Sequence, residues 1–576
     1  MSELEIKNLN ELLNFDDSKK THIIHKLLDT HSNLFIDDIN NIEVTKDVYK
    51  DTDIEKWAYE LPELKGSKEL LLKIINNPIN NIDNLIKRQK AYINNYDTVS
   101  FKVLKEYEND ILWTYKLNDE IMKDNAINIL FPTGFINSYI NIIEPMLDTY
   151  HFYKIGFIPL SALIYPLSSL LAPFFYVNKY MQFNLTFGSY LKLIKGFIIM
   201  FFKSSGNLKL NIMKFIFFCI YIFLYLYNIY QTFEFSYILY KTKNTLHEKM
   251  NGLINFINET NNIINDFNLE KTQEELLLPF IKKFYKPTDI NLTNTMTNIY
   301  KLWKNNDIKN NISKLLITIY TYDIINSISI IKNMNNYTFA NYNNLESTKI
   351  WNMKNPILNI KQISNPVNLN KNIIITGPNA AGKTTYVKSI LSNVLLSQTL
   401  GIIYGSNSNM QIYDCIYSFM RISDELGSKS YFEVEAELCS KMINKADELF
   451  KLNKKGLFLM DEPMHSTPPT EGMATAFAVA ENIGLKSNIN IIITTHFFKL
   501  TSLSKLYPNN FINLSVEAIQ NHDNSFIFPY KIKKGSSCQC IAIELLSNKK
   551  FPESVINSAK NMKKIICNNI LDKTYV

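Results

Sequence analysis

The sequence predicts an α/β domain at the C-terminal end, preceded by a mostly α-helical core that a hydrophobic segment interrupts. Two observations carry this prediction. From about Asn355 onward, short apolar runs suited to β-strands alternate with helical stretches, which is typical of an α/β domain. Earlier in the chain, Ile155–Asn178 and Phe215–Phe233 contain no charged residue, whereas the flanking sequence is polar.

These changes of character divide the 576 residues into four expected parts. Residues 1–150 form the first part of a helical core, and residues 151–240 form a hydrophobic segment that associates with a membrane. Residues 241–350 return to polar, helical sequence, and residues 351–576 form the α/β domain. Leu and Ile positions at spacings of three and four residues support the helical assignments.

Composition excludes a wholly disordered chain, because 46% of the residues are hydrophobic. The net charge of +7 is small for this length, and only Arg88 and Arg421 among 61 basic residues are arginines. An excess of Lys, Asn and Ile is typical of an A/T-rich genome, so it does not indicate nucleic-acid binding.

Six scattered cysteines without paired spacing favour free thiols in a reducing compartment. The polar N-terminus lacks the apolar run of a cleaved secretory signal.

The two uncharged runs predict association with a membrane through residues 155–177 and 215–233. Each is close to the ~20 residues that an α-helix needs to cross a hydrocarbon core. Pro159, Pro166 and Pro173 are expected to kink the first helix. The alternative is a pair of buried helices in a soluble core.

The arrangement in the membrane stays open between two alternatives. A simple hairpin leaves both flanking parts on the cytosolic side and places Lys179–Lys214 outside. That loop holds six lysines and no acidic residue, against the positive-inside tendency. A re-entrant or interfacial arrangement with everything on the cytosolic face removes the conflict.

A glycine-containing loop follows a predicted strand at Lys371–Thr376 and precedes a predicted helix over Val387–Leu396. It has the G-x-x-x-x-G-K-[ST] spacing whose backbone N–H groups and helix N-terminus bind phosphate. Lys383 is expected to reach the β- and γ-phosphates, and the Thr384 hydroxyl to bind Mg²⁺. ATP and Mg²⁺ are therefore the expected ligands. The expected nucleotide-binding residues are Gly377, Pro378, Asn379, Ala380, Ala381, Gly382, Lys383, Thr384 and Thr385.

Two further predicted strands end in residues suited to phosphate chemistry. Gly456–Met460 runs into Asp461, expected to hold Mg²⁺, and Glu462, expected to act as the general base toward water. The strand at Ile489–Thr495 ends at His496, which is placed to hydrogen-bond the γ-phosphate. A lone histidine is more often a satisfied core residue.

Ser430 precedes a predicted helix and offers its hydroxyl and nearby N–H groups to an anion. Within one subunit no phosphate lies nearby, but in a head-to-tail dimer Ser430 would face the partner's nucleotide. The alternative is a plain helix N-cap.

Together these segments resemble the MutS family of ABC-type ATPases. The resemblance rests on TGPNAAGKTT at 376–385, RISDELGSKSYFEVEAEL at 421–438, LFLMDEP at 457–463, TTHFFKLT at 494–501 and the segment 530–560. A weaker likeness at 77–92 and 322–341 is similar to the start and return of the family's helical core. By this resemblance, the hydrophobic segment lies inside the helical core, at the position from which the family's long helices that enclose DNA would otherwise extend.

The resemblance implies a P-loop ATP hydrolase that forms a homodimer through its ATPase domains, with Ser430 acting on the partner's nucleotide. It also implies that Gln398 and Asn365–Asn370 line the nucleotide. Two departures stand out. The segment after Glu462, Pro463–Glu471, reads PMHSTPPTE and lacks the family's Gly-Thr element. No Phe-x-Glu motif occurs in the first 150 residues, and a separate mismatch-binding domain has no room.

Two functions therefore remain open. One is a MutS-like ATPase that couples ATP turnover to DNA binding, in a role related to mismatch repair or recombination. The other is a membrane-anchored mechanochemical ATPase that does not act on DNA. Either protein would be membrane-associated with its ATPase domain in the cytosol. A transporter is disfavoured, because two apolar segments are few for a pathway.

Overall fold

The computed structural model describes residues 17–32, 42–93, 100–115, 127–134, 137–203, 208–266, 279–282, 292–333, 337–343, 346–358, 361–420, 431–521, 526–537 and 551–572, with a few single residues between them. The chain divides into two units. The first comprises residues 1–30, 102–266 and 285–316, and the second comprises residues 31–101, 267–284 and 317–576. Helix α16 (Asn306–Asn333) begins in the first unit and ends in the second.

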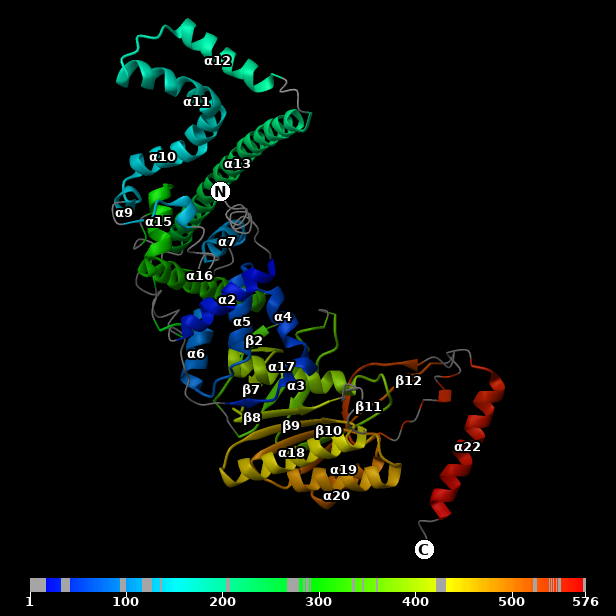
Figure 1. The fold of residues 1–576 in the computed structure, drawn as a ribbon. Helices are drawn as coiled ribbons and strands as arrows, with labels where there is room; N and C mark the ends of the chain where they lie inside the picture. The colour runs from blue at the N-terminus through cyan, green and yellow to red at the C-terminus, as the bar shows by residue number, and fades with distance from the viewer. Residues whose placement is uncertain are drawn as a thin grey trace. The chain divides into compact units, whose positions relative to one another are not determined.

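The second unit is built on a seven-stranded sheet (Figure 1). All neighbouring strands pair in parallel except the last two, which are antiparallel. This confirms the predicted α/β domain. The strands in spatial order are β1 (Glu43–Val44), β8 (Cys415–Phe419), β9 (Gly456–Asp461), β10 (Ile489–Thr494), β5 (Asn372–Thr376), β11 (Phe511–Val516) and β14 (Ile532–Lys534).

Helices cover both faces of this sheet, α17 (Lys383–Thr399) on one and α18 (Tyr431–Lys451) with α19 (Pro469–Gly484) on the other (Figure 1). Every residue of β5 and β9 is buried, as expected for parallel strands with helices on both sides. The carboxyl ends of β5, β9 and β10 lie side by side, because Thr494 pairs with both Ile375 and Asp461. Polar residues that follow these strands therefore meet at one edge of the sheet.

One edge strand comes from far upstream in the sequence. Residues of β1 pair in parallel with β8, and the Glu43 N–H donates to Asp414 O at 2.9 Å. Helix α3 (Lys46–Thr52) follows directly and contacts β8 and α17. Ser418 on β8 donates to the Asp51 carboxylate at 2.6 Å. Residues 43–52 are thus part of the α/β unit, although the sequence predicted only helical core for residues 1–150.

The remaining elements of this unit are further helices and small sheets. Asp323 on α16 accepts hydrogen bonds from the N–H groups of Glu63 and Leu64, at the start of one of these helices. The helices are α4 (Ile54–Glu60), α5 (Lys65–Ile75), α6 (Ile82–Ala91), η5 (Phe498–Ser502), α20 (Leu503–Leu506) and α22 (Glu553–Asp572). The strands are β2 (Tyr337–Phe339), β3 (Lys349–Met353), β4 (Asn365–Asn368), β6 (Ile402–Tyr404), β7 (Ser408–Asn409), β12 (Ile519–Gln520) and β13 (Phe526–Ile527).

The first unit is helical, and its longest element is α13 (Leu208–Asp266), with 59 residues in one helix. The C-terminal half of α13 packs against α7 (Lys102–Tyr115), where Lys249 pairs with Asp110 at 2.5 Å. Gly252 allows this close approach, because a Cβ there would lie 2.2 Å from the Asp110 carboxylate. The other helices are α2 (Asp17–Thr30), α9 (Asn137–Ile140), α10 (Glu144–Phe152), η3 (Tyr153–Phe157), α11 (Ile158–Tyr180), α12 (Phe187–Phe202) and α15 (Met296–Lys304).

Helices long and apolar enough to cross a membrane occur in this unit, judged by length and composition alone. In α13 the most apolar window has a mean hydropathy of 1.9 and none of it is buried. The helices Glu144–Pro166 and Ser168–Tyr180 together pass the same test and meet at a bend of 71°. That bend falls at Pro166, one of the three expected kinks. A further apolar stretch, Asn306–Lys332, is 83% buried and belongs to the core.

Candidate nucleotide-binding site

The loop between β5 and α17 has the backbone shape of an anion-binding loop. Gly377, Ala380 and Gly382 have φ values of 149°, 65° and 95°, a region that favours glycine. A Cβ on Gly377 would lie 2.3 Å from Val516 O, so only glycine fits there. Gly382 is the N-cap of α17 and provides no side-chain cap. The first N–H groups of the helix are thus available for an anion.

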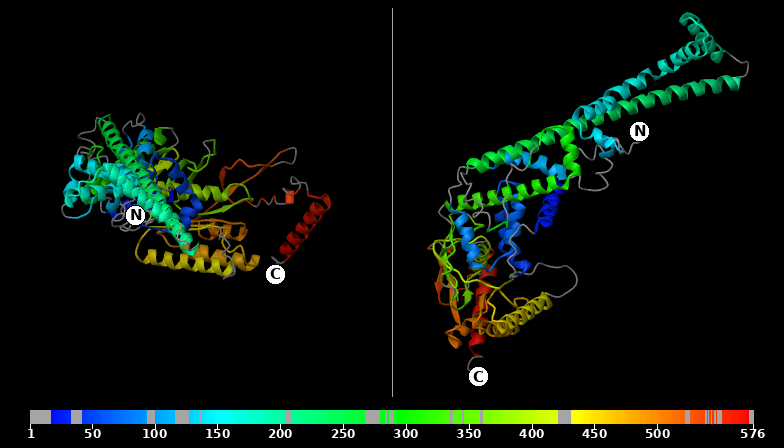
Figure 2. Two further views of the ribbon diagram at one scale, coloured as in Figure 1. Left: turned by 45° about the horizontal axis from the view of Figure 1, so that its top comes forward. Right: turned by 90° about the vertical axis from the view of Figure 1, so that its left-hand side faces the viewer.

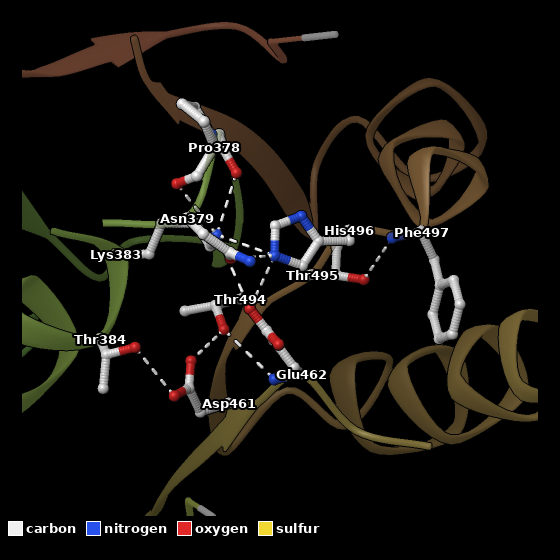
Figure 3. Close-up of polar contacts among 11 residues, drawn as sticks. Pro378, Asn379, Lys383, Thr384, Asp461, Glu462, Thr494, Thr495, His496 and Phe497 are labelled. Carbon is white, nitrogen blue, oxygen red and sulfur yellow. Dashed lines mark hydrogen bonds and ion pairs between the residues drawn. The ribbon is translucent and has the colours of Figure 1, made fainter. Parts of the chain in front are cut away.

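Lys383 is the cation at the centre of this loop, and only 5% of its side chain is exposed. Its Nζ donates to Gly377 O at 2.9 Å and to Pro378 O at 3.4 Å (Figure 3). Burial lowers the pKa of Lys383, and the nearby Glu462 and Asp461 carboxylates partly oppose that effect. Phosphate oxygens beside Nζ would stabilise the charge further.

Thr384 and Asp461 bring two hard oxygen donors together beside the loop. The Thr384 hydroxyl donates to Asp461 Oδ2 at 2.9 Å, and the Thr494 hydroxyl donates to Asp461 Oδ1 (Figure 3). Hydroxyl and carboxylate oxygens suit Mg²⁺, which binds to one or two protein groups together with substrate phosphates and water. The donor set therefore fits the expected metal. Among the described residues, no group of three His, Cys, Asp or Glu side chains forms a closed metal site.

Glu462 and His496 face each other across the ends of β9 and β10. Glu462 Oε1 lies 2.8 Å from His496 Nε2 and 3.7 Å from Lys383 Nζ. The hydrogen bond from His496 lowers the pKa of Glu462 to about 2, burial opposes the shift, and the positive charges nearby add to it. Glu462 itself has a φ of 55°, and its N–H donates to Thr494 O at 3.0 Å. The backbone of Glu462 is thus bonded to the neighbouring strand β10, and its carboxylate is ionised at neutral pH.

His496 Nε2 lies within hydrogen-bond distance of three polar atoms, and a single nitrogen cannot satisfy all of them. It lies 2.7 Å from Asn379 Oδ1 and 3.2 Å from Lys383 Nζ, in addition to the Glu462 contact (Figure 3). The two oxygens need a proton on Nε2, whereas the lysine needs a lone pair there. These contacts therefore compete, and a phosphate that draws Lys383 away would leave His496 with acceptors only.

A cavity of about 990 Å³ opens in front of these groups. One end is lined by the loop with Lys383, Thr384 and Glu462, and the other by aromatic and aliphatic side chains. Phe528 and Tyr530 stack with ring centroids 6.2 Å apart, and Asn365 Nδ2 donates to Tyr530 O at 2.8 Å. A polar end beside an apolar end suits a phosphorylated ligand with an aromatic base. The apolar wall comprises Met353, Leu358, Ile363, Phe528, Pro529 and Tyr530.

Comparison with known proteins identifies this part of the chain. Residues 373–566 match the family described as MutS domain V. Over these residues the chain is therefore similar to the MutS family.

Three relatives are each named DNA mismatch repair protein MutS. The protein from Clostridium perfringens is 31% identical over 272 residues, covering 45% of this chain and 29% of the relative. The protein from Acholeplasma laidlawii is 29% identical, covering 41% and 28%. The protein from Pseudothermotoga lettingae is 25% identical, covering 43% and 30%. The chain thus spans less than a third of the length of these MutS relatives.

The structure brings together most of the residues that the MutS motifs predicted. It brings together Lys383, Thr384, Asp461, Glu462 and His496 beside the loop. Of these, Lys383, Thr384 and Glu462 line the cavity. Of the other loop residues, those that line it are Pro378, Asn379, Ala380, Gly382 and Thr385. Ser430 lies in residues 421–430, outside the described residues.

Two expectations drawn from the MutS resemblance have different outcomes. Asn365 lines the cavity, as predicted for the Asn365–Asn370 stretch. Gln398 does not line it, because its side chain is fully buried and its amide exchanges hydrogen bonds with Tyr413 N and O, at 3.0 and 2.9 Å. Sequence reasoning missed Phe528 and Tyr530 as cavity residues. The only signal was that Tyr530 begins the MutS-like segment 530–560, with Phe528 two residues before it.

The segment that departs from the MutS pattern has its own support. Glu435 on α18 is buried and accepts hydrogen bonds from Ser466 N–H at 3.3 Å and Ser466 Oγ at 2.5 Å. Ser466 lies four residues after Glu462. The helix that follows the predicted Ser430 element is therefore connected to the loop that carries the predicted base.

Proposed function

We propose that this chain is an ABC-type P-loop ATPase that binds Mg²⁺-ATP in the cavity and hydrolyses it. The observation that carries the proposal is that Lys383, Glu462 and His496 lie together with the Thr384–Asp461 pair beside the loop. Lys383, Thr384 and Glu462 of this group line the cavity. The apolar end, with Tyr530 and Phe528, would hold the base, and the loop would hold the phosphates.

The residues divide the chemistry among them. Lys383 and the loop N–H groups bind the β- and γ-phosphates. A water molecule attacks the γ-phosphorus, Glu462 accepts its proton, and the bond to the bridging oxygen breaks to give ADP and phosphate. Mg²⁺ at Thr384 and Asp461 would neutralise phosphate charge. Glu462 must first leave its contact with His496, because a carboxylate with a pKa near 2 that is already hydrogen-bonded is a poor base.

We further propose that the ATPase acts as a homodimer that couples ATP turnover to DNA binding, in a role related to mismatch repair or recombination. The names of the three MutS relatives support the DNA role. Ser430 would complete the partner's nucleotide site. Direct reading of mismatches is not part of this proposal, because the first 150 residues hold no Phe-x-Glu motif.

A second candidate function is that of a membrane-anchored mechanochemical ATPase that does not act on DNA. The observation that favours it is the apolar surface of residues 155–177 and 215–233, which the structure leaves exposed. In this case the chain is membrane-associated with its ATPase in the cytosol, and the dimer cycle would move helices in the bilayer.

Steady-state ATP hydrolysis by the detergent-purified full-length chain tests both, with Lys383→Ala as the inactive control. The ATPase proposal requires Mg²⁺-dependent turnover that Lys383→Ala abolishes. Titration with duplex and single-stranded DNA at two salt concentrations separates the candidates. Salt-sensitive changes in rate support the DNA role, since phosphate contacts release counterions. A rate indifferent to DNA supports the membrane-anchored ATPase.

A further inference from the structure

Three helices of the first unit carry an unusually apolar surface. Helix α12 has no buried residue, and the most apolar window of α13 is fully exposed. Large side chains are exposed there by more than half of their area, far beyond the scattered apolar residues of an ordinary surface. Examples are Phe175 at 64%, Phe197 at 72%, Ile199 at 58%, Phe217 at 58% and Phe223 at 65%.

The same segment carries the entire excess positive charge of the chain. Residues 149–233 contain seven lysines and no Asp, Glu or Arg, while the whole chain has a net charge of +7. The remaining residues are therefore balanced in charge. An apolar surface combined with a uniformly positive charge needs a partner that is both apolar and anionic.

The lysines lie at the ends of the apolar runs. Lys154 and Lys179 enclose Ile155–Asn178, and Lys195 and Lys203 enclose the shorter run 196–202. Lys214 precedes Phe215–Phe233. Lysine side chains at such boundaries extend their ammonium groups to the headgroup region while their stems stay in apolar surroundings.

The three helices contact one another only along limited edges. Tyr225 on α13 donates to Leu163 O on α11 at 3.0 Å, and Tyr190 on α12 donates to Leu170 O at 2.5 Å. Phe202 and Phe218 meet with ring centroids 5.1 Å apart. Figure 2 shows α11 beside the N-terminal half of α13, with α12 at their far end. These contacts leave the outer faces of all three helices apolar.

We propose that α11, α12 and the N-terminal half of α13 are embedded in a bilayer with anionic headgroups, and that the lysines at the ends of the apolar runs pair with those headgroups. This inference rests on the membrane attachment proposed above and adds the class of lipid. Duplex DNA would pair with the lysines but would leave the aromatic and aliphatic side chains in water. A second copy of the segment would bring like charges together.

A competition between two vesicle populations tests the lipid class. Full-length protein in detergent is diluted into a mixture of phosphatidylcholine vesicles and denser vesicles that contain about a third phosphatidylglycerol, and flotation separates the two. The wild type is expected to favour the anionic vesicles at least tenfold at low salt. Because each lysine near an anionic surface contributes about a fivefold preference, Lys195→Gln/Lys203→Gln/Lys214→Gln should remove most of that bias.

The matched control is Lys451→Gln/Lys454→Gln/Lys505→Gln, which removes three exposed lysines of the other unit and should leave the bias unchanged. Equal distribution of the wild type between the vesicles would overturn the anionic headgroup while keeping the bilayer. No flotation with either vesicle would overturn both the anionic headgroup and the bilayer. Salt-sensitive retention on duplex DNA, or self-association without detergent, would then show whether DNA or a second copy of the chain covers the apolar surface. The flotation assay contains no ATP, and the ATPase assay in detergent contains no vesicles. A failure of the lipid proposal is therefore distinguishable from a failure of the ATPase proposal.

Discussion

The Glu462 carboxylate lies 2.8 Å from His496 Nε2, so the proposed general base is held by a residue two positions beyond the end of the neighbouring strand β10. Both side chains depend on the register between β9 and β10, in which Asp461 pairs with Thr494. A change in either strand end would therefore affect the charge state of the site as well as its geometry.

His496→Ala should raise the pKa of Glu462 from about 2 toward its ordinary value of 4.5, because the hydrogen bond from His496 is the main cause of the depression. The depressed pKa stabilises the folded state above pH 4.5, and that contribution is lost as the pH falls toward 2. The free energy of unfolding between pH 5 and pH 2 should thus fall less steeply in His496→Ala. Glu462→Gln serves as the reference without the titrating group, and identical slopes in wild type and His496→Ala would contradict the assignment.

Glu462→Gln should retain ATP binding while hydrolysis falls ~100-fold or more, since the amide cannot accept the proton from water. Single-turnover hydrolysis and a separate binding measurement with a fluorescent nucleotide distinguish the two effects. Glu481→Gln, on α19 and outside the cavity lining, is the matched control. Normal turnover in Glu462→Gln would show that another group accepts the proton.

Tyr530→Ala should weaken nucleotide binding by roughly tenfold, because an aromatic wall that stacks with a base is removed. Binding of inorganic triphosphate should stay unchanged, since the phosphate loop is intact. Phe450, which is half exposed at the end of α18, provides a control in Phe450→Ala. An equal loss for ATP and triphosphate would indicate instead that Tyr530 supports the loop beside Gly382, where a Cβ would lie 3.1 Å from its ring.

Glu435→Ala should reduce hydrolysis more than nucleotide binding, because it frees Ser466 and the loop that follows Glu462. The variant also removes the acceptor of the Ser466 N–H and hydroxyl, and because Ser466 is exposed to water the loss of stability is only about 0.5–1.5 kcal/mol. Chemical denaturation measures the stability, and turnover is compared at a temperature where both proteins are folded. Glu435→Gln keeps an acceptor and should recover part of the activity; equal turnover in all three proteins would exclude a role for this contact.

Local patterns in the sequence predicted the α/β fold and the phosphate end of the cavity well. The strand at 372–376 and the loop after it are continuous in sequence, and the ends of β9 and β10 follow from parallel pairing. Long-range contacts were not predictable in this way. Tyr530 enters the cavity from about 150 residues beyond the loop, and β1 has only two paired residues, too few for any periodic pattern. Gln398 was assigned to the nucleotide only through the MutS resemblance, but its amide exchanges hydrogen bonds with the backbone of Tyr413.

The pairing of β1 with β8 has a consequence for any attempt to isolate the ATPase. A fragment that starts at residue 351 would contain the whole MutS match at 373–566 yet would lack the strand that covers β8. The backbone N–H and C=O groups of β8, along with its buried Cys415 and Ile416, would then lie at an open sheet edge. Such edges recruit strands from other molecules. A fragment cut at residue 351 is therefore expected to aggregate, and a fragment that also contains residues 43–52 is expected to stay monomeric.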